Sequence, residues 1–315
     1  MNNNHRPTCA PGAALILVLA VLLAVSGLSL RATELTTRTS EAASRLILEY
    51  QAGIKAETGL QISLDILAQN EQGQDILPVQ AQDMSWQDRG LQVNITPCSA
   101  KLNINALLGK SSDSSRMQQA LQDILDNQGL PRADLDHLLY WIGALDSAPA
   151  DFAASNAQQT TAWSGLDFTA PGRDLQRPEE LLLIPGFEQL PQEWVREQFT
   201  VWGQPGRINL NYASQEVALA LLPELEPYWD RITSMRQDTG LTHPNQLLTE
   251  IGLDMTTYQQ ILGFLSWQPT HFEIHIESQV GSWYKKYRYI VQKEPINTDS
   301  GPQVLVKDIL HSGQK

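Results

Sequence analysis

The hydrophobic pattern of the chain begins with an uncharged apolar run close to the amino terminus. Residues 13–30, AALILVLAVLLAVSGLSL, form 18 consecutive positions without a charged side chain, which is a typical length for a short membrane span. Arg6 precedes the run and Arg31 follows it, so the flanking charges indicate little about orientation. A cleaved secretory signal peptide is the alternative interpretation, with the small residues of Ser26–Ser29 near its cleavage site.

An amphipathic pattern continues directly from the apolar run. Its apolar side chains recur at spacings of three and four, with charged residues between them, and no proline interrupts residues 13–77. These apolar positions are Leu35, Ala42, Ala43, Leu46, Ile47 and Tyr50. The sequence therefore predicts one helix over residues 13–54, roughly 60 Å long at 1.5 Å per residue, half of it membrane span and half stalk.

The rest of the chain predicts short strands on either side of a helical segment. The helical segment covers Pro131–Trp267, where leucine-rich stripes recur at helical spacing. Period-two alternation and turn residues mark the strands, with one predicted turn at Gly281. The predicted strands are Gln61–Leu67, Ile76–Gln80, Leu91–Thr96, a segment in which Phe272, Ile274 and Ile276 alternate with polar residues, Tyr284–Gln292 and Gln303–Val306.

Charge separates the helical segment from its surroundings. Residues 105–267 contain 21 acidic and 9 basic side chains, a net charge of −12 out of −13 for the whole chain. A chain that repels phosphate is a poor candidate for a general nucleic-acid binder. The predicted fold class is α+β, with an acidic α-helical domain inserted into a small sheet. The predicted segments are a leader at 1–12, the helix at 13–54, the first part of the sheet at 55–104, the inserted domain at 105–267 and the C-terminal strands at 268–315.

Two segments of the chain resemble each other. KLNINA at 101–106 is similar to RINLNYA at 207–213, and a leucine-rich stretch follows each of them. Asparagine at such places holds a turn or caps a helix through its side-chain amide. The alternative is a polar ligand site. The four residues concerned are Asn103, Asn105, Asn209 and Asn211.

Patterns typical of enzymes are incomplete in this sequence. The Gly109-Lys110-Ser111 tripeptide lacks the glycine that a phosphate loop needs at position 104, which is Ile. A polar strand face could hold a metal or be solvated, and solvation is the simpler interpretation; its residues are His271, Glu273, His275 and Glu277. Cys98 is expected to be a buried apolar residue, and no enzymatic activity is predicted.

The chain resembles the minor pseudopilin K of the bacterial type II secretion system, also called general secretion pathway protein K (GspK). A polar leader that ends at Gly12, directly before the apolar run, is similar to the processing region of this family. The two Asn-x-Asn segments, KLNINALL at 101–108 and RINLNYASQEVALALLPEL at 207–225, also fit the family. Between them, RPEELLLIPGF at 177–187 resembles the family's Glu-Leu…Gly segment, carried here by Glu180, Leu181 and Gly186.

The resemblance implies a long N-terminal transmembrane, pilin-like helix, a small antiparallel pseudopilin sheet and a large inserted all-α domain with two SAM-like (helix-hairpin-helix-like) units. It implies a non-enzymatic subunit that caps the tip of the periplasmic pseudopilus and helps to initiate its assembly. The implied partners are other minor pseudopilins and, through them, the major pseudopilin. The implied location is the inner membrane, crossed once, with the bulk of the chain in the periplasm.

The resemblance also implies roles for individual residues of the apolar helix. Prepilin peptidase would cut between Gly12 and Ala13, so that Ala13 becomes the first residue of the mature chain. Leu17 then occupies the fifth position, where most pilin-like subunits carry Glu. That carboxylate would meet the amino terminus of a neighbouring subunit, and a subunit with leucine there fits the topmost place in a short filament.

No cofactor is required by this function, although members of the family can bind calcium in the inserted domain. The implied ligands here are Asp146, Asp151 and Asp167. Calcium needs six to eight oxygens, and three aspartates with backbone carbonyls are a small set. Tyr140 and Gly143 stand where further acidic residues are expected.

The alternative function is that of a membrane-anchored periplasmic helix-hairpin-helix protein that binds nucleic acid. Such modules hold phosphates on exposed backbone N–H groups at glycine-containing hairpins. The corresponding hairpins here are Ile184–Glu188 and Leu222–Glu226, and the second has no glycine and two glutamates. We therefore expect no nucleic-acid partner.

Overall fold

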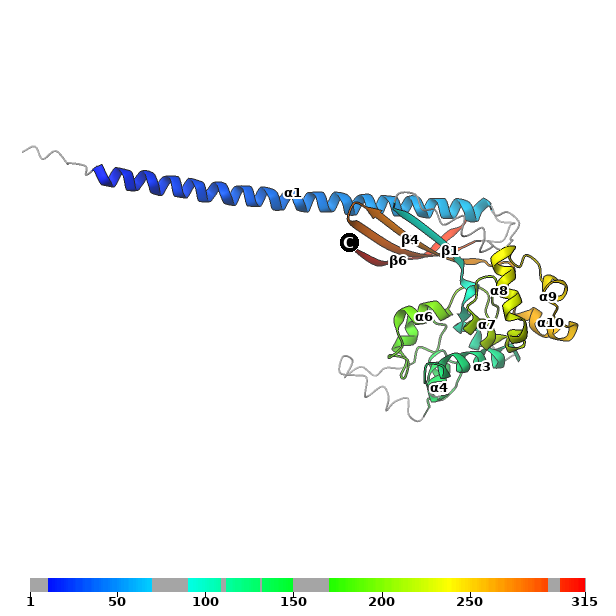
Figure 1. Ribbon diagram of the computed structural model, residues 1–315. Helices are drawn as coiled ribbons and strands as arrows, with labels where there is room; N and C mark the ends of the chain where they lie inside the picture. Colours follow the sequence, from blue (N-terminus) through cyan, green and yellow to red (C-terminus); the bar gives the residue numbers. More distant parts are fainter. Residues whose placement is uncertain are drawn as a thin grey trace, which may run out of the picture.

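The molecule consists of a long helix, a sheet against the carboxyl-terminal part of this helix, and a block of short helices (Figure 1). The α+β class and the long N-terminal apolar helix predicted from the sequence are therefore confirmed. The computed structural model describes residues 11–69, 90–108, 112–130, 132–149, 170–293 and 301–314.

Helix α1, Pro11–Gln69, continues further than predicted. The predicted strand at Gln61–Leu67 is wrong because these residues form the last turns of α1, and Ile76–Gln80 lies outside the described residues. Buried positions in this half of α1 recur at spacings of three and four, which is the period of a helix face; they are Ala52, Ala56, Leu60, Ser63 and Leu67. The apolar residues near the end of α1 therefore pack on the sheet instead of joining it.

Four antiparallel strands form the sheet, in the order β1-β4-β5-β6. They are β1 Leu91–Pro97, β4 His271–Val280, β5 Trp283–Gln292 and β6 Gln303–Gln314. The register places Val93 beside Ile276, and Ile274 beside Tyr289, so these side chains share the face that packs on α1. Gly281, with φ of 58°, lies in the turn between β4 and β5, as predicted.

The block between β1 and β4 is built mainly from short helices. A two-residue parallel pair, β2 Leu102–Asn103 with β3 Phe199–Thr200, is an exception to the all-helical expectation. The α-helices are α3 Ser112–Asp126, α4 Arg132–Trp141, α6 Gln192–Gln198, α7 Gln215–Leu221, α8 Trp229–Asp238, α9 Gln246–Thr249 and α10 Met255–Ile261. The 3-10 helices are η1 Cys98–Ala100, η2 Ile104–Leu108, η3 Pro178–Leu183, η4 Pro223–Tyr228 and η5 Leu262–Phe264.

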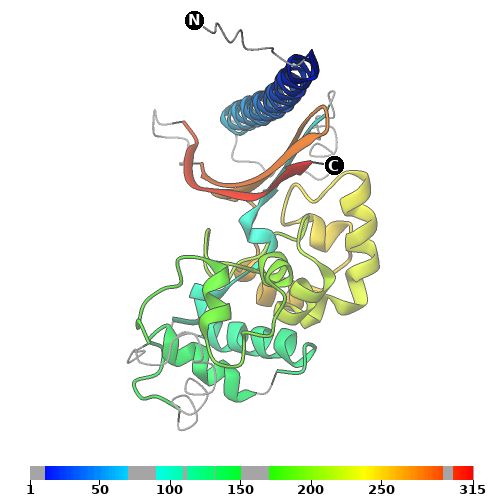
Figure 2. The same cartoon turned by 90° about the vertical axis from the view of Figure 1, so that its left-hand side faces the viewer.

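Two separate hydrophobic clusters stabilise the molecule. The larger lies within the block, with members from Leu102 to Leu265, and the smaller lies between α1 and the sheet, with members from Ala56 to Val291. The two clusters share no residue. The curved sheet lies between α1 and the block (Figure 2), so its second face is turned toward the block.

Candidate functional site

The first half of α1 extends away from the rest of the molecule (Figure 1). Among the described residues, α1 is the helix that is long and apolar enough to cross a membrane, and its apolar part lies near the amino terminus. Every side chain from Leu15 to Leu30 is exposed, and Leu17 is 66% exposed. Gly12 and Ala13 lie in the first turn of α1. Cleavage between them stays a prediction.

The apolar stripe of the stalk does not pack on the sheet. Its large members remain exposed, whereas Ala52 and Ala56, on another side of α1, are buried where α1 contacts the strands. The exposed members are Leu35, Leu46, Ile47, Tyr50 and, one turn further, Ile54. A continuous apolar stripe on a helix is typical of a surface that a second helix covers.

The first Asn-x-Asn segment forms a turn and holds a distant loop. The Asn103 side-chain oxygen accepts a hydrogen bond from the backbone N–H of Asn105 at 3.1 Å. The Asn105 amide forms two hydrogen bonds with the backbone of Leu175, donating to its carbonyl at 3.0 Å and accepting from its N–H at 2.9 Å. These bonds join the start of the block to the segment that leads into η3.

The second Asn-x-Asn segment makes the same hydrogen bonds. Asn209 Oδ1 accepts from the N–H of Asn211 at 2.9 Å. The Asn211 amide donates to the carbonyl of Leu241 and accepts from its N–H, both at 2.7 Å. The structural interpretation of the four asparagines is therefore supported, because the side-chain amides of Asn105 and Asn211 are both hydrogen-bonded to backbone groups.

The similarity of the two halves of the block extends beyond the Asn-x-Asn segments. LQRPEELL at 175–182 corresponds to LTHPNQLL at 241–248. Glu180 Oε1 accepts from the N–H groups of Gln176 and Arg177, and Gln246 Oε1 accepts from those of Thr242 and His243. The repeated Leu-x-x-Pro-x-Glu/Gln-Leu-Leu pattern was the signal in the sequence that could have revealed this duplication.

A glycine follows each repeated segment and approaches the third residue of a helix. Gly186 has φ of 94° and lies against Asp134 of α4, whereas Gly252 has φ of 83° and lies near Arg231 of α8. Leu181, between Glu180 and Gly186, is fully buried in the larger cluster. The carboxylate of Asp134 lies at the hairpin where a helix-hairpin-helix module would hold phosphate, and it repels that anion. This arrangement disfavours nucleic-acid binding.

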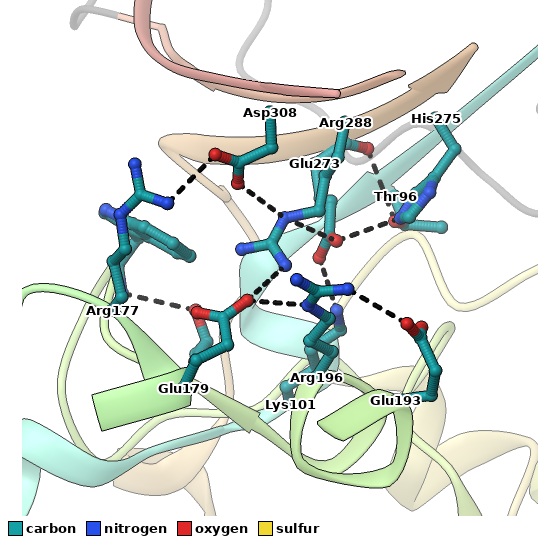
Figure 3. A network of polar contacts seen from close by, with 12 residues as sticks. Thr96, Lys101, Arg177, Glu179, Glu193, Arg196, Glu273, His275, Arg288 and Asp308 are labelled. Carbon is teal, nitrogen blue, oxygen red and sulfur yellow. Dashed lines mark hydrogen bonds and ion pairs between the residues drawn. The ribbon is translucent and has the colours of Figure 1, made fainter. Parts of the chain in front are cut away.

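The second face of the sheet carries a buried network of charges (Figure 3). Glu273 of β4 is 3% exposed, so the predicted solvated strand face is wrong at this position. Its carboxylate pairs with Lys101, which precedes β2, and accepts a hydrogen bond from His275 Nε2 at 2.9 Å. Glu277, further along the same face, pairs with Lys286 of β5.

Arg288 of β5 lies at the centre of this network and is 1% exposed. Its Nη1 donates to Glu179 of η3 at 2.9 Å, and its Nε lies 3.4 Å from Glu273 and 3.8 Å from Asp308 of β6. Glu179 also accepts from Arg196 Nε of α6 at 2.6 Å. No local sequence pattern marks these residues, because their pairing depends on the tertiary fold.

The network shifts the pKa values of two carboxylates, the buried Glu273 and the partly buried Glu179. Burial alone would raise the pKa of Glu273, but the hydrogen bond from His275 and the charges of Lys101 and Arg288 hold it well below its ordinary value. Burial likewise opposes ionisation of Glu179, and the hydrogen bond from Arg196 lowers its pKa. Both groups are therefore ionised in the folded chain at neutral pH.

The expected calcium ligands are not brought together in the described part of the chain. Asp146 is exposed in the loop after α4, whereas Asp151 and Asp167 lie outside the described residues. Within the described ranges, no three His, Cys, Asp or Glu side chains are grouped as a metal site would require. Calcium binding by these three aspartates stays a prediction.

Cys98 is a buried apolar residue, as expected. It lies in η1 and is 1% exposed. Burial, together with the charge of Glu273, raises the pKa of its thiol to about 12. The thiol is therefore protonated and unreactive at neutral pH.

Comparison with known proteins shows a similarity of fold. The sequence matches no protein-family model and no curated protein. Among solved structures, the fold is similar to a chain in the crystal structure of the GspK-GspI-GspJ complex from the Type 2 Secretion System of enterotoxigenic Escherichia coli, with a TM-score of 0.57 and 14% sequence identity. The match covers 85% of this chain and 99% of that chain. This chain therefore shares its fold with a component of a pseudopilin complex.

Proposed function

We propose that this chain is a minor pseudopilin of a type II secretion system and corresponds to the K subunit. The observation that carries the proposal is the fold similarity to a chain of the GspK-GspI-GspJ complex over 85% of the sequence. The long apolar helix α1 supports it, because such a helix anchors a subunit in a membrane and in a filament. The duplicated hydrogen bonds of Asn105 and Asn211 are consistent with two SAM-like units in the block.

The place that we propose for the subunit is the tip of the periplasmic pseudopilus, where it helps to initiate assembly. Two features support this place. Leu17 offers no carboxylate to a subunit above it. The block lies on the far side of the sheet from α1 (Figure 2), and its width would hinder stacking of a further subunit.

The proposed partners are other minor pseudopilins and, through them, the major pseudopilin. The exposed stalk stripe, with Leu46, Ile47 and Tyr50, supports this proposal because its large side chains have no cover within the described chain. Burial of such side chains against a second helix is favourable by about 1.5–3 kcal/mol each. The proposed location is the inner membrane, with one span and the bulk of the chain in the periplasm.

Cleavage by prepilin peptidase is the step that tests this proposal most directly. We expect mass spectrometry of the protein purified from cells with active prepilin peptidase to show Ala13 as the mature amino terminus. A Gly12→Leu variant should keep the leader, because the small residue before the cut is lost. A mature terminus near residue 30 would show that a signal peptidase processes the chain and would contradict the pseudopilin proposal.

A further inference from the structure

Charged side chains are buried in the contact between the sheet and the block, and each part has its own apolar core. The chain crosses between them twice, through η1 and through Ser266–Thr270. Both crossings are fixed to the block, since Asn209 N–H donates to Ser99 O and Ser266 N–H donates to Ile208 O, each at 2.7 Å. The separate hydrophobic clusters do not by themselves define the angle between sheet and block.

Charged side chains connect the two parts. Arg288 of β5 donates to Glu179 of η3 at 2.9 Å, and Arg177, just before η3, donates to Asp308 of β6 at 2.9 Å (Figure 3). The guanidinium of Arg288 also lies 5.6 Å from the ring of Trp202 in the block. The guanidinium group is planar and its hydrogen bonds are directional, so these contacts define an orientation more sharply than apolar contacts do.

Each part retains compensating charges when the connecting pairs are removed. On the block, Glu179 is paired with Arg196 at 2.6 Å. On the sheet, Arg288 lies within 3.8 Å of both Glu273 and Asp308. Loss of the Glu179–Arg288 and Arg177–Asp308 pairs therefore leaves no isolated buried charge, which is the situation that strongly destabilises a protein. The pair of Lys101 with Glu273 lies beside the η1 crossing and stays in place.

We propose that the ion pairs Glu179–Arg288 and Arg177–Asp308 form an orientation lock that fixes the helical block at one angle on the sheet. A buried pair such as Glu179–Arg288 contributes little net stability but can specify one arrangement among several. The Arg177–Asp308 pair, whose arginine side chain is 51% exposed, adds a second connection at the edge of the contact. The lock makes the block a rigid extension of the sheet, so that both parts meet a neighbouring molecule as one body. This inference concerns the geometry of the chain itself and does not depend on the proposed function.

Distances between two spin labels test the lock in the full-length chain in detergent micelles. Labels are attached at Gln259→Cys on α10 and Ser312→Cys on β6, both exposed positions, in a Cys9→Ser background. Cys98 stays unlabelled because it is buried and protonated. We expect one narrow distance distribution with the lock intact, and a distribution about twofold wider in Arg177→Gln/Glu179→Gln, as for a released hinge.

A matched control removes a charge from the same network but leaves the pairs that join the block to the sheet unchanged. Glu193→Gln takes away only the exposed partner of Arg196 within the block, so the distribution should stay narrow. An unchanged width in the double variant would overturn the proposal, as would equal broadening in the Glu193 variant. Loss of the near-ultraviolet circular dichroism of the tryptophans in the double variant would also overturn it, because the pairs would then hold the fold together.

Discussion

Asp134 and Gly186 lie so close together that a side chain at position 186 would displace the Asp134 carboxylate. A Cβ at residue 186 would overlap the Asp134 carboxylate, and even the more distant Oδ2 would be only 2.7 Å away. The backbone of Gly186 has φ of 94°, a conformation that side chains disfavour. Sterics and backbone conformation therefore require glycine at the turn after η3.

Gly186→Ala should destabilise the block strongly. We expect a loss of about 3 kcal/mol or more in the free energy of unfolding, since overpacking and an unfavourable φ add together. Urea titration followed by tryptophan fluorescence measures this change. Gly129→Ala is the matched control because its φ is 76° but no atom lies within 4 Å of the added Cβ. Gly129→Ala should lower the free energy of unfolding by about 1–2 kcal/mol. Equal losses in the two variants would show that the contact with Asp134 has no effect on stability.

Strand alternation predicted which side chains of β4 share a face, but not that the charged face with Glu273 is covered by the block. Phe272, Ile274 and Ile276 face α1, as their period indicates. Glu273 was expected in solvent because a lone carboxylate is costly to bury. Its burial is possible only because Lys101 and Arg288 lie beside it, and no local pattern connects residues so distant in sequence.

The end of α1 was mispredicted for a related reason. Gln61–Leu67 is short and alternates weakly, so its sequence is compatible with both helix and strand. Packing of Leu60, Ser63 and Leu67 against the sheet decides in favour of the helix. By contrast, the two Asn-x-Asn segments were recognised from sequence because asparagine forms its turn locally, through the N–H two residues later.

Asn211→Ala should destabilise the block more than Asn105→Ala. Both variants lose two hydrogen bonds to one leucine backbone, but those of Asn211 to Leu241 are fully buried, whereas those of Asn105 to Leu175 are partly exposed. We expect about 2–4 kcal/mol for Asn211→Ala and about 1–2 kcal/mol for Asn105→Ala, because unsatisfied buried groups are costly.

Urea titration of both variants measures the difference, with Asn127→Ala at an exposed position as the control. The control should change the free energy of unfolding by less than about 0.5 kcal/mol. Equal losses for Asn105 and Asn211 would mean that burial of the hydrogen bonds does not distinguish the two halves.

Because of Glu273, the free energy of unfolding should depend on pH in the acidic range. Its pKa in the folded chain lies well below the ordinary value, so the unfolded chain binds a proton first as the pH falls. The stabilising contribution is fully present above about pH 5 and decreases at lower pH, by up to about 1.4 kcal/mol per pH unit. Unfolding by urea at a series of pH values between 6 and 3 (about the ordinary glutamate range) measures this slope.

The Glu273→Gln variant should show a shallower slope than the unsubstituted chain over that range. Glu277→Gln is the matched control because Glu277 lies on the same strand face but is half exposed in its pair with Lys286. Its curve should parallel that of the unsubstituted chain. Parallel curves for Glu273→Gln as well would mean that its carboxylate has the same pKa in the folded and unfolded states.

The last prediction concerns Leu17, which would be the fifth residue of the mature chain. In pilin-like subunits a glutamate there is expected to meet the amino terminus of a neighbouring subunit, because a charge within lipid or packed helices is costly unless it is paired. Leu17→Glu supplies this carboxylate. If the missing charge alone excludes the chain from the filament body, labelled antibody in electron micrographs should then appear along the shaft and not only at the tip.

Leu19→Glu is the matched control, since it places the same charge at a similar depth on another side of α1. It should not enter the shaft, because its carboxylate does not reach the neighbouring amine. If Leu17→Glu stays at the tip while remaining membrane-inserted, the width of the block, and not the charge, excludes the chain. If the unsubstituted chain is already found along the shaft, the tip assignment is wrong, because neither leucine at this position nor the block then prevents a further subunit from stacking above it.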